Sequence, residues 1–312
     1  MGKDIDVRQK VIQTVMAVIF LCGLLIFLYP KTTEWYAAYK NQKAITSFEE
    51  SKKSVKNVTE QHTSSVTQQP VDNKRLDELQ QDMLDYNERL YREGQKELKD
   101  PFDFEEPSFV LKDYGIEQEV FATIEIPAME VKLPLYLGAT KENMTKGGAI
   151  LGQTSMPLGG KNTNVVIAAH RGYRGISMFR EIEKLKEGDL IEITTLFDTL
   201  TYQVSRCKII EPDQINEILI QPGEDMITLL TCHPYTKNTH RYLVFAKRCE
   251  NIAKSEETDK AEKGKEQQYI PERAEDVEKE ISGHIIWMEK YIPLMGIIVI
   301  FLLIVGGIIV TR

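Results

Sequence analysis

The pattern of apolar and polar positions divides the chain into two uncharged segments near its ends and a strand-rich middle. Residues 11–30 (VIQTVMAVIFLCGLLIFLYP) and 291–311 (YIPLMGIIVIFLLIVGGIIVT) contain no charged side chain. Each segment has about 20 residues, the length that a helix needs to cross roughly 30 Å of hydrocarbon. The pattern therefore predicts two transmembrane helices. The alternatives are a cleaved signal peptide for the first segment and a buried core helix for the second.

Polar stretches separate these segments from the middle of the chain. Residues 31–71 are rich in Ser, Thr, Gln and Lys and predict a solvated linker that is helical at its start. Residues 250–290 are charged and predict a second linker. Residues 72–107 begin with an apolar stripe at helical spacing, which predicts an amphipathic helix packed on the neighbouring domain. Pro101 and Pro107 end that helix and favour extended backbone. The stripe consists of Leu76, Leu79, Met83, Tyr86 and Leu90.

Short β-rich runs separated by turns dominate residues 108–249. Two short helices are expected at 178–186 and 213–219. Because the strands are many and the helices few, the region is predicted to be a mainly β domain, either a barrel or a sandwich. With residues 1–10 as an N-terminal tail, the chain reads as anchor, linker, helix, β domain, linker and anchor. The predicted strands are 119–126, 131–137, 148–151, 164–170, 189–195, 200–210, 226–231 and 242–247.

Composition and cysteine spacing exclude some functions. The chain has 312 residues with 28% charged and 42% hydrophobic, which is ordinary for a globular domain. Its net charge of −8 argues against a nucleic-acid partner, because phosphate binding needs a basic surface. The four cysteines form no CxxC pair, and a bridge between Cys207 and Cys249 is left open.

Three residues with complementary chemistry stand at predicted strand ends, where an active site at the mouth of a barrel would need them. In ITLLTCHPYTKNTHRYLVF, Cys232 ends one β-rich run and Arg241 begins the next, and in VVIAAHRG, His170 ends an apolar strand. A thiolate attacks acyl carbons, and an imidazole exchanges protons with the thiol and with a leaving amine. A guanidinium stays protonated and can donate hydrogen bonds to an oxyanion, an effect of about 3 kcal/mol. Taken singly, each residue could instead be structural or solvated.

A metal site formed by His170, Cys232, His233 and His240 is the weaker interpretation of the same residues. Neighbouring strand residues point to opposite faces, so Cys232 and His233 cannot share a ligand set, and no second cysteine lies at ligand spacing. No metal ion and no cofactor are therefore expected.

These motifs resemble those of a known family. TLLTCHPYTKNTHRYLV is similar to the signature of the sortases, and VVIAAHRG resembles their histidine block. The CHPYTKNTHR insert and the earlier DPF resemble the class C, pilus-assembling branch, and the resemblance spans residues 72–248. After Arg241 the chain reads YLVFAKR, which departs from the more usual pattern of that branch and leaves the substrate subclass open.

The resemblance implies a closed eight-stranded β-barrel and a cysteine transpeptidase. Sortases cut a Leu-Pro-x-Thr-Gly-like sorting motif between Thr and Gly, hold the product as a thioester, and pass it to an amine. Cys232, His170 and Arg241 match the family's catalytic residues. Thr231 would support the oxyanion through its hydroxyl or backbone. Asp100 and Phe102 would form a lid, the first reaching the arginine and the second covering the thiol.

The resemblance also implies partners and a location. The substrates would be surface proteins or pilins with a C-terminal sorting signal, and the acceptor a pilin lysine or a cell-wall peptide. The chain would cross the lipid bilayer twice, with its catalytic domain on the extracellular face of a Gram-positive-type envelope. Two other functions stay open: a membrane-tethered cysteine peptidase that hydrolyses the acyl-enzyme, and a non-enzymatic surface adhesin.

Overall fold

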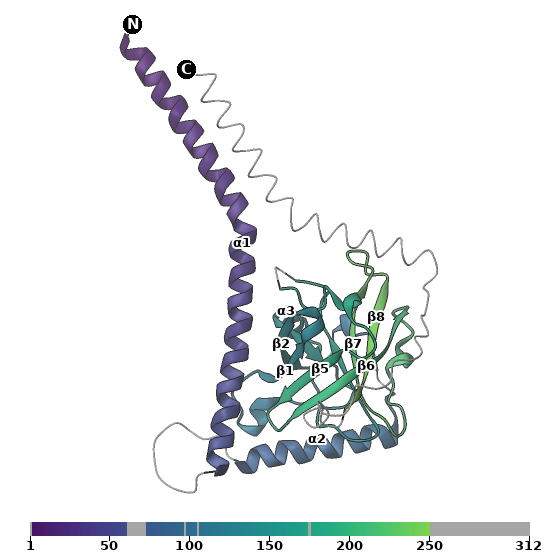
Figure 1. Cartoon of the computed structure of the whole chain (residues 1–312). Helices are drawn as coiled ribbons and strands as arrows, with labels where there is room; N and C mark the ends of the chain where they lie inside the picture. The colour runs from purple at the N-terminus through teal and green to yellow at the C-terminus, as the bar shows by residue number, and fades with distance from the viewer. Residues whose placement is uncertain (1, 61–72, 97, 105, 174–175, 250–312) are drawn as a thin grey trace, which may run out of the picture. The chain divides into compact units, whose positions relative to one another are not determined.

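The computed structural model describes residues 2–60, 73–96, 98–104, 106–173 and 176–249 (Figure 1). The chain divides into two compact units, whose described parts are residues 2–33 and residues 34–249. The predicted linker 250–290 and the predicted span 291–311 lie outside the described residues. The first predicted span, 11–30, lies within a long helix, α1 (Gly2–Glu60). Among the residues that the structure describes, no helix is both long enough and apolar enough to cross a bilayer.

The larger unit contains a closed barrel of eight strands in the order β1-β2-β3-β4-β7-β8-β6-β5. The pairs β2–β3 and β4–β7 are parallel, and the other neighbouring strands are antiparallel. This confirms a mainly β fold and decides for a barrel over a sandwich. The strands are β1 (Val120–Ile126), β2 (Val131–Leu137), β3 (Gly148–Ile150), β4 (Thr163–Ala168), β5 (Leu190–Thr195), β6 (Thr199–Ile210), β7 (Asp225–His233) and β8 (His240–Arg248).

Both faces of β4, β7 and β8 are buried, which explains why their sequences are continuous apolar runs rather than alternating ones. One set of side chains, such as Ile167 on β4 and Leu229 on β7, belongs to the main core inside the barrel. The alternate positions, such as Ala168, Leu230 and Leu243, form a second apolar cluster on the outer face of the barrel wall. A functional site on this outer wall is therefore built on strands that are fixed from both sides.

Helices cover the barrel. The amphipathic helix expected from the apolar stripe is α2 (Asn73–Glu93), and Leu79 and Met83 are fully buried in the main core. The helix expected at 178–186 is shorter in the structure, where only Ile182–Lys184 forms a 3-10 turn. The remaining helical elements are α3 (Lys141–Lys146), η1 (Pro101–Asp103), η2 (Leu111–Tyr114), η3 (Pro127–Met129), η4 (Ile182–Lys184) and η5 (Ile215–Ile218).

The linker expected at 31–71 is helical at its start, where α1 continues to residue 60, but that part is packed against the barrel unit rather than fully solvated. Ile45 and Phe48 are each only 1% exposed, and Phe48 belongs to the main core. The helix also makes polar contacts with β2, since Nδ2 of Asn41 donates to the Lys132 carbonyl at 3.3 Å and the Lys132 ammonium lies 2.9 Å from Glu49. Because the stretch is mostly polar, its scattered apolar residues give little helical periodicity, and the sequence therefore indicated a linker.

Candidate active site

Strand register brings the three sequence-predicted catalytic residues to one level of the barrel wall. In the parallel pair β4–β7, Ala168 lies opposite Leu230. His170 comes two residues after Ala168, and Cys232 comes two residues after Leu230. In the antiparallel pair β7–β8, Cys232 lies opposite Arg241. Because neighbouring strands are about 4.8 Å apart, the three residues stand side by side at three adjacent strand ends.

The site faces outward rather than into the mouth of the barrel. Cys232 shares its strand face with Leu230, which belongs to the outer apolar cluster. Phe102, from the segment that follows α2, packs against the same cluster. Cys232 is 8% exposed. The predicted position at strand ends is therefore observed, but the thiol points away from the barrel interior and is covered from outside.

Asp100 binds Arg241 as the resemblance implied. The Nε of Arg241 donates to both carboxylate oxygens of Asp100, at 3.0 and 3.1 Å, and Nη2 also donates to this carboxylate. The other arm of the guanidinium, Nη1, donates to the carbonyls of Asn238 and His240 at 3.2 and 3.0 Å. Burial by itself lowers the pKa of Arg241, but the bonds to Asp100 raise it and the net pKa lies above the ordinary value. All three nitrogens of the guanidinium are thus occupied in this conformation.

Phe102 covers the other side of the site. Its ring centroid lies 5.0 Å from the guanidinium carbon of Arg241 and 5.7 Å from the ring centroid of His170. His170 also stacks on Tyr173, with centroids 5.0 Å apart and ring planes 18° apart. Asp100 holds the turn that carries Phe102, because its side chain accepts a bond from the Phe102 amide at 3.4 Å. One short segment therefore contacts both the guanidinium and the imidazole.

Burial keeps the thiol and the imidazole uncharged in this covered conformation. Burial raises the pKa of Cys232 to about 11; Arg241 opposes this rise, Asp100 adds to it, and Arg171 opposes it. Burial also lowers the pKa of His170. A thiol with so high a pKa is a poor nucleophile at neutral pH. In this conformation the burial of Cys232 thus disfavours the thiolate form.

Thr231 has a different contact from the one expected. It is fully buried, and its hydroxyl donates to the Ala169 carbonyl at 2.7 Å. The Ala169 amide in turn donates to the Leu230 carbonyl at 3.2 Å. Since the hydroxyl proton is engaged there, it does not serve an oxyanion in this conformation. The observed effect of Thr231 is to tie the end of β4 to the end of β7.

Sequence reasoning missed a charged cluster behind the site. Arg171 and His233, which directly follow His170 and Cys232, meet Glu183 of η4. Nη1 of Arg171 lies 2.9 Å from Nδ1 of His233, and Nδ1 lies 3.1 Å from a Glu183 oxygen. The only sequence signal was that His233 must point away from the thiol. His233 contacts Arg171 and Glu183 on that side of the strand, away from Cys232. It therefore does not join Cys232 in the metal-ligand set that was considered as the weaker interpretation.

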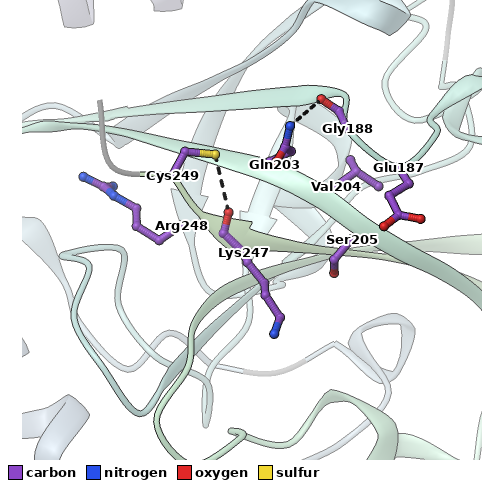
Figure 2. A pocket seen from close by; sticks show the side chains of 8 residues that line it. All are labelled: Glu187, Gly188, Gln203, Val204, Ser205, Lys247, Arg248 and Cys249. Carbon is purple, nitrogen blue, oxygen red and sulfur yellow. Dashed lines mark hydrogen bonds between the residues drawn. The ribbon is translucent and has the colours of Figure 1, made fainter. Parts of the chain in front are cut away.

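The pocket in Figure 2 lies elsewhere on the barrel. It has a volume of about 460 Å³, and its Lys247 pairs with Met226, at the opposite end of β7 from Cys232. Cys249 also lines it, and both Cys249 and Cys207 are free thiols, so the bridge left open by the sequence is absent. The other lining residues are Glu187, Gly188, Gln203, Val204, Ser205 and Arg248.

The chain is similar to curated sortases over part of its length. It is 30% identical to sortase A of Bacillus anthracis over 128 residues, which are 41% of this chain and 59% of that protein. It is 27% identical to sortase A of Listeria monocytogenes over 154 residues, covering 49% of this chain and 64% of that protein. The chain thus spans less than two thirds of the length of these relatives.

Solved structures match over more of the chain. Sortase C1 of GBS pilus island 1 is 30% identical with a TM-score of 0.56, and the match covers 70% of this chain and 97% of that one. Sortase C of Streptococcus pneumoniae is 32% identical with a TM-score of 0.55, covering 67% and 97%. The sortase-domain family model matches residues 124–249, which include all three aligned residues of the site. The chain therefore belongs to the sortase family, and these structural neighbours are class C sortases.

Proposed function

We propose that this chain is a cysteine transpeptidase that joins a sorting-motif protein to an amine. The observation that supports it best is the register of β4, β7 and β8, which aligns His170, Cys232 and Arg241 on one outer face. A nucleophile, a proton carrier and a fixed hydrogen-bond donor are the three groups that acyl transfer through a covalent intermediate needs. We expect the motif to be Leu-Pro-x-Thr-Gly-like, with cleavage between Thr and Gly.

The first half-reaction forms a thioester. His170 accepts the proton of the Cys232 thiol, and the resulting thiolate attacks the Thr carbonyl carbon, so that a carbon–sulfur bond forms and the carbonyl oxygen becomes negative. Arg241 donates hydrogen bonds to that oxygen, and His170 as imidazolium gives its proton to the Gly nitrogen as the carbon–nitrogen bond breaks. The Thr acyl group is then held on sulfur.

The second half-reaction regenerates the enzyme. A primary amine attacks the thioester carbon, His170 accepts the proton that the amine loses, and Cys232 leaves as a thiolate. The product has a new amide bond. Water in place of the amine would give a free acid, so exclusion of water decides between transpeptidase and peptidase.

The covering segment regulates this chemistry. Asp100 holds the Arg241 donors that a developing oxyanion would use, and Phe102 contacts both Arg241 and His170. We therefore propose that residues 100–102 act as a lid that must open before substrate binds. The same motion would expose the thiol and lower its pKa from the covered value of about 11.

Substrate, acceptor and location are proposed from likeness and sequence. The solved structure of sortase C from Streptococcus pneumoniae bears on catalysis and pilin substrate specificity in that protein. We propose surface proteins or pilins as substrates here, with a pilin lysine or a cell-wall peptide as the acceptor. The uncharged segments 11–30 and 291–311 support a location at the cell membrane, with the barrel on the extracellular face.

The test is mass spectrometry of the full chain in detergent with a sorting-motif peptide, with and without an amine acceptor. We expect an acyl adduct on Cys232, an amine-linked product, and neither in Cys232→Ala, which should keep the wild-type fold by circular dichroism. Free acid as the sole product would make the protein a peptidase. Two results would overturn the assignment. One is ligation by Cys232→Ala, and the other is the absence of an acyl adduct in Asp100→Asn when its Cys232 thiol reacts with an alkylating reagent.

A further inference from the structure

We propose that Arg171, Glu183 and His233 form a positioning cluster that holds His170 and Cys232 in alignment from behind the barrel wall. The proposal rests on the proposed function, because it assigns a role in acyl transfer to residues that touch no substrate. These three residues are called the rear cluster below.

The contacts of the rear cluster join the two strand ends that carry the acid–base residue and the nucleophile. Nη2 of Arg171 donates to the Glu183 carboxylate, and Nη1 lies 2.9 Å from Nδ1 of His233. The same Glu183 oxygen lies 3.1 Å from that Nδ1. The guanidinium of Arg171, the residue after His170, therefore contacts His233, the residue after Cys232.

Strand alternation places His233 of the rear cluster on the face of β7 opposite the thiol. In β7, Cys232 shares a face with Leu230, while His233 shares the inner face with Thr231. Across β8, the His233 ring lies 5.6 Å from the ring of Tyr242. A contact that fixes His233 consequently fixes the backbone on which Cys232 is mounted without blocking the thiol.

The turn that carries Glu183 is itself anchored. Ile182 and Phe179 are fully buried in the main core. The amide of Phe179 donates to the His170 carbonyl at 3.1 Å. Glu183 is thus held on a packed support that also touches the backbone of His170, so the cluster closes a ring through both strand ends.

Burial shows that this cluster is a costly arrangement. The Arg171 and Glu183 side chains are only 3% and 17% exposed. Burial raises the pKa of Glu183, but the hydrogen bonds and charges of His233 and Arg171 lower it by more. The net pKa lies below its ordinary value, so the carboxylate stays ionised. Removing charges from water costs several kcal/mol per ion. Packed apolar residues of similar volume often stabilise a fold at least as much as a buried ion pair does. What the ion cluster adds is directional geometry, which acyl transfer needs.

The test compares Glu183→Gln and His233→Asn with Glu224→Gln, all in the Asp100→Asn background so that the lid does not limit the rate. Glu224 is a suitable control because it pairs with Lys247 at 2.8 Å beside the opposite end of β7. We expect each cluster variant to lose about tenfold in kcat for transpeptidation with KM within about twofold. Alkylation of Cys232 by a small reagent should change less than about threefold, and the control should match its background.

A double-mutant cycle separates positioning from general stability. Because the three residues act as one unit, Glu183→Gln/His233→Asn should be no slower than either single variant. Glu183→Asp, which keeps the charge but is shorter, should lose less kcat than Glu183→Gln and serves if the latter does not fold. Unchanged kcat, or a loss that parallels a fall in Tm and a rise in alkylation, would overturn the proposal. If even the Asp100→Asn protein forms no acyl adduct, the proposed function fails instead.

Discussion

Replacing Asp100 with Asn should make the thiol of Cys232 far more reactive. In the covered conformation, the Asp100 carboxylate accepts hydrogen bonds from Nε and Nη2 of Arg241 and holds the turn that carries Phe102. Asn keeps the shape of the side chain but removes the negative charge. The change therefore weakens the lid contact and also removes a charge that raises the pKa of the thiol.

The expected size follows from the pKa and from the strength of charged hydrogen bonds. With a pKa of about 11, roughly one thiol in ten thousand is ionised at pH 7, against about one in thirty at the ordinary value near 8.5. Full uncovering would thus raise the thiolate fraction by about 300-fold. Losing even one charged hydrogen bond, about 1.5 kcal/mol, favours opening about tenfold. We expect alkylation of Asp100→Asn to rise between these two limits.

The assay is the rate of alkylation of Cys232 by a small uncharged reagent, followed by mass spectrometry to separate it from Cys22, Cys207 and Cys249. Asp103→Asn is the matched control, because Asp103 lies in the same 3-10 turn, is exposed, and makes no direct bond to Arg241 among the described contacts. A wild-type rate in Asp100→Asn, or an equal rise in Asp103→Asn, would refute the reasoning.

Three further outcomes are expected. Arg241→Lys should lower kcat about 100-fold or more, since an ammonium lacks the planar fork that serves an oxyanion; steady-state ligation kinetics measure this, and a wild-type kcat would contradict it. Thr231→Val should lower the free energy of unfolding by about 1–3 kcal/mol, because the buried Ala169 carbonyl loses its donor, whereas Thr231→Ser should not; urea denaturation reports both. Burial lowers the pKa of His170, so the unfolded chain binds more protons as pH falls through about 6.5, and stability should fall there more steeply in the wild type than in His170→Gln. Equal slopes in urea midpoints would show that the imidazole is not buried in solution.

Strand positions were predictable because local sequence and burial agree in this barrel. The run MITLLT is apolar at every position except its threonines, and in the structure β7 is buried on both faces. The turn insert after Cys232 then fixes an antiparallel partner, and the register sets Arg241 opposite the thiol. Candidate residues at strand ends could thus be named from sequence, whereas their outward direction depends on barrel closure and on what covers the outer wall.

Contacts between distant segments could not be predicted in the same way. Glu183 lies in a short charged stretch, and nothing in its neighbours indicates that it meets Arg171 and His233. The hydroxyl of Thr231 was free to serve several roles until the position of Ala169 was known. Such assignments depend on tertiary distances rather than on periodicity.

The part of α1 that packs on the barrel unit, around residues 41–49, determines which fragment of this protein can be purified without aggregation. Ile45 and Phe48 cover apolar surface of the barrel unit, and Asn41 and Glu49 bind β2. A recombinant fragment that starts at the family match, or even at α2, would leave that surface exposed to water and prone to aggregation. The shortest soluble piece should accordingly start upstream of residue 41, although the sequence there looks dispensable.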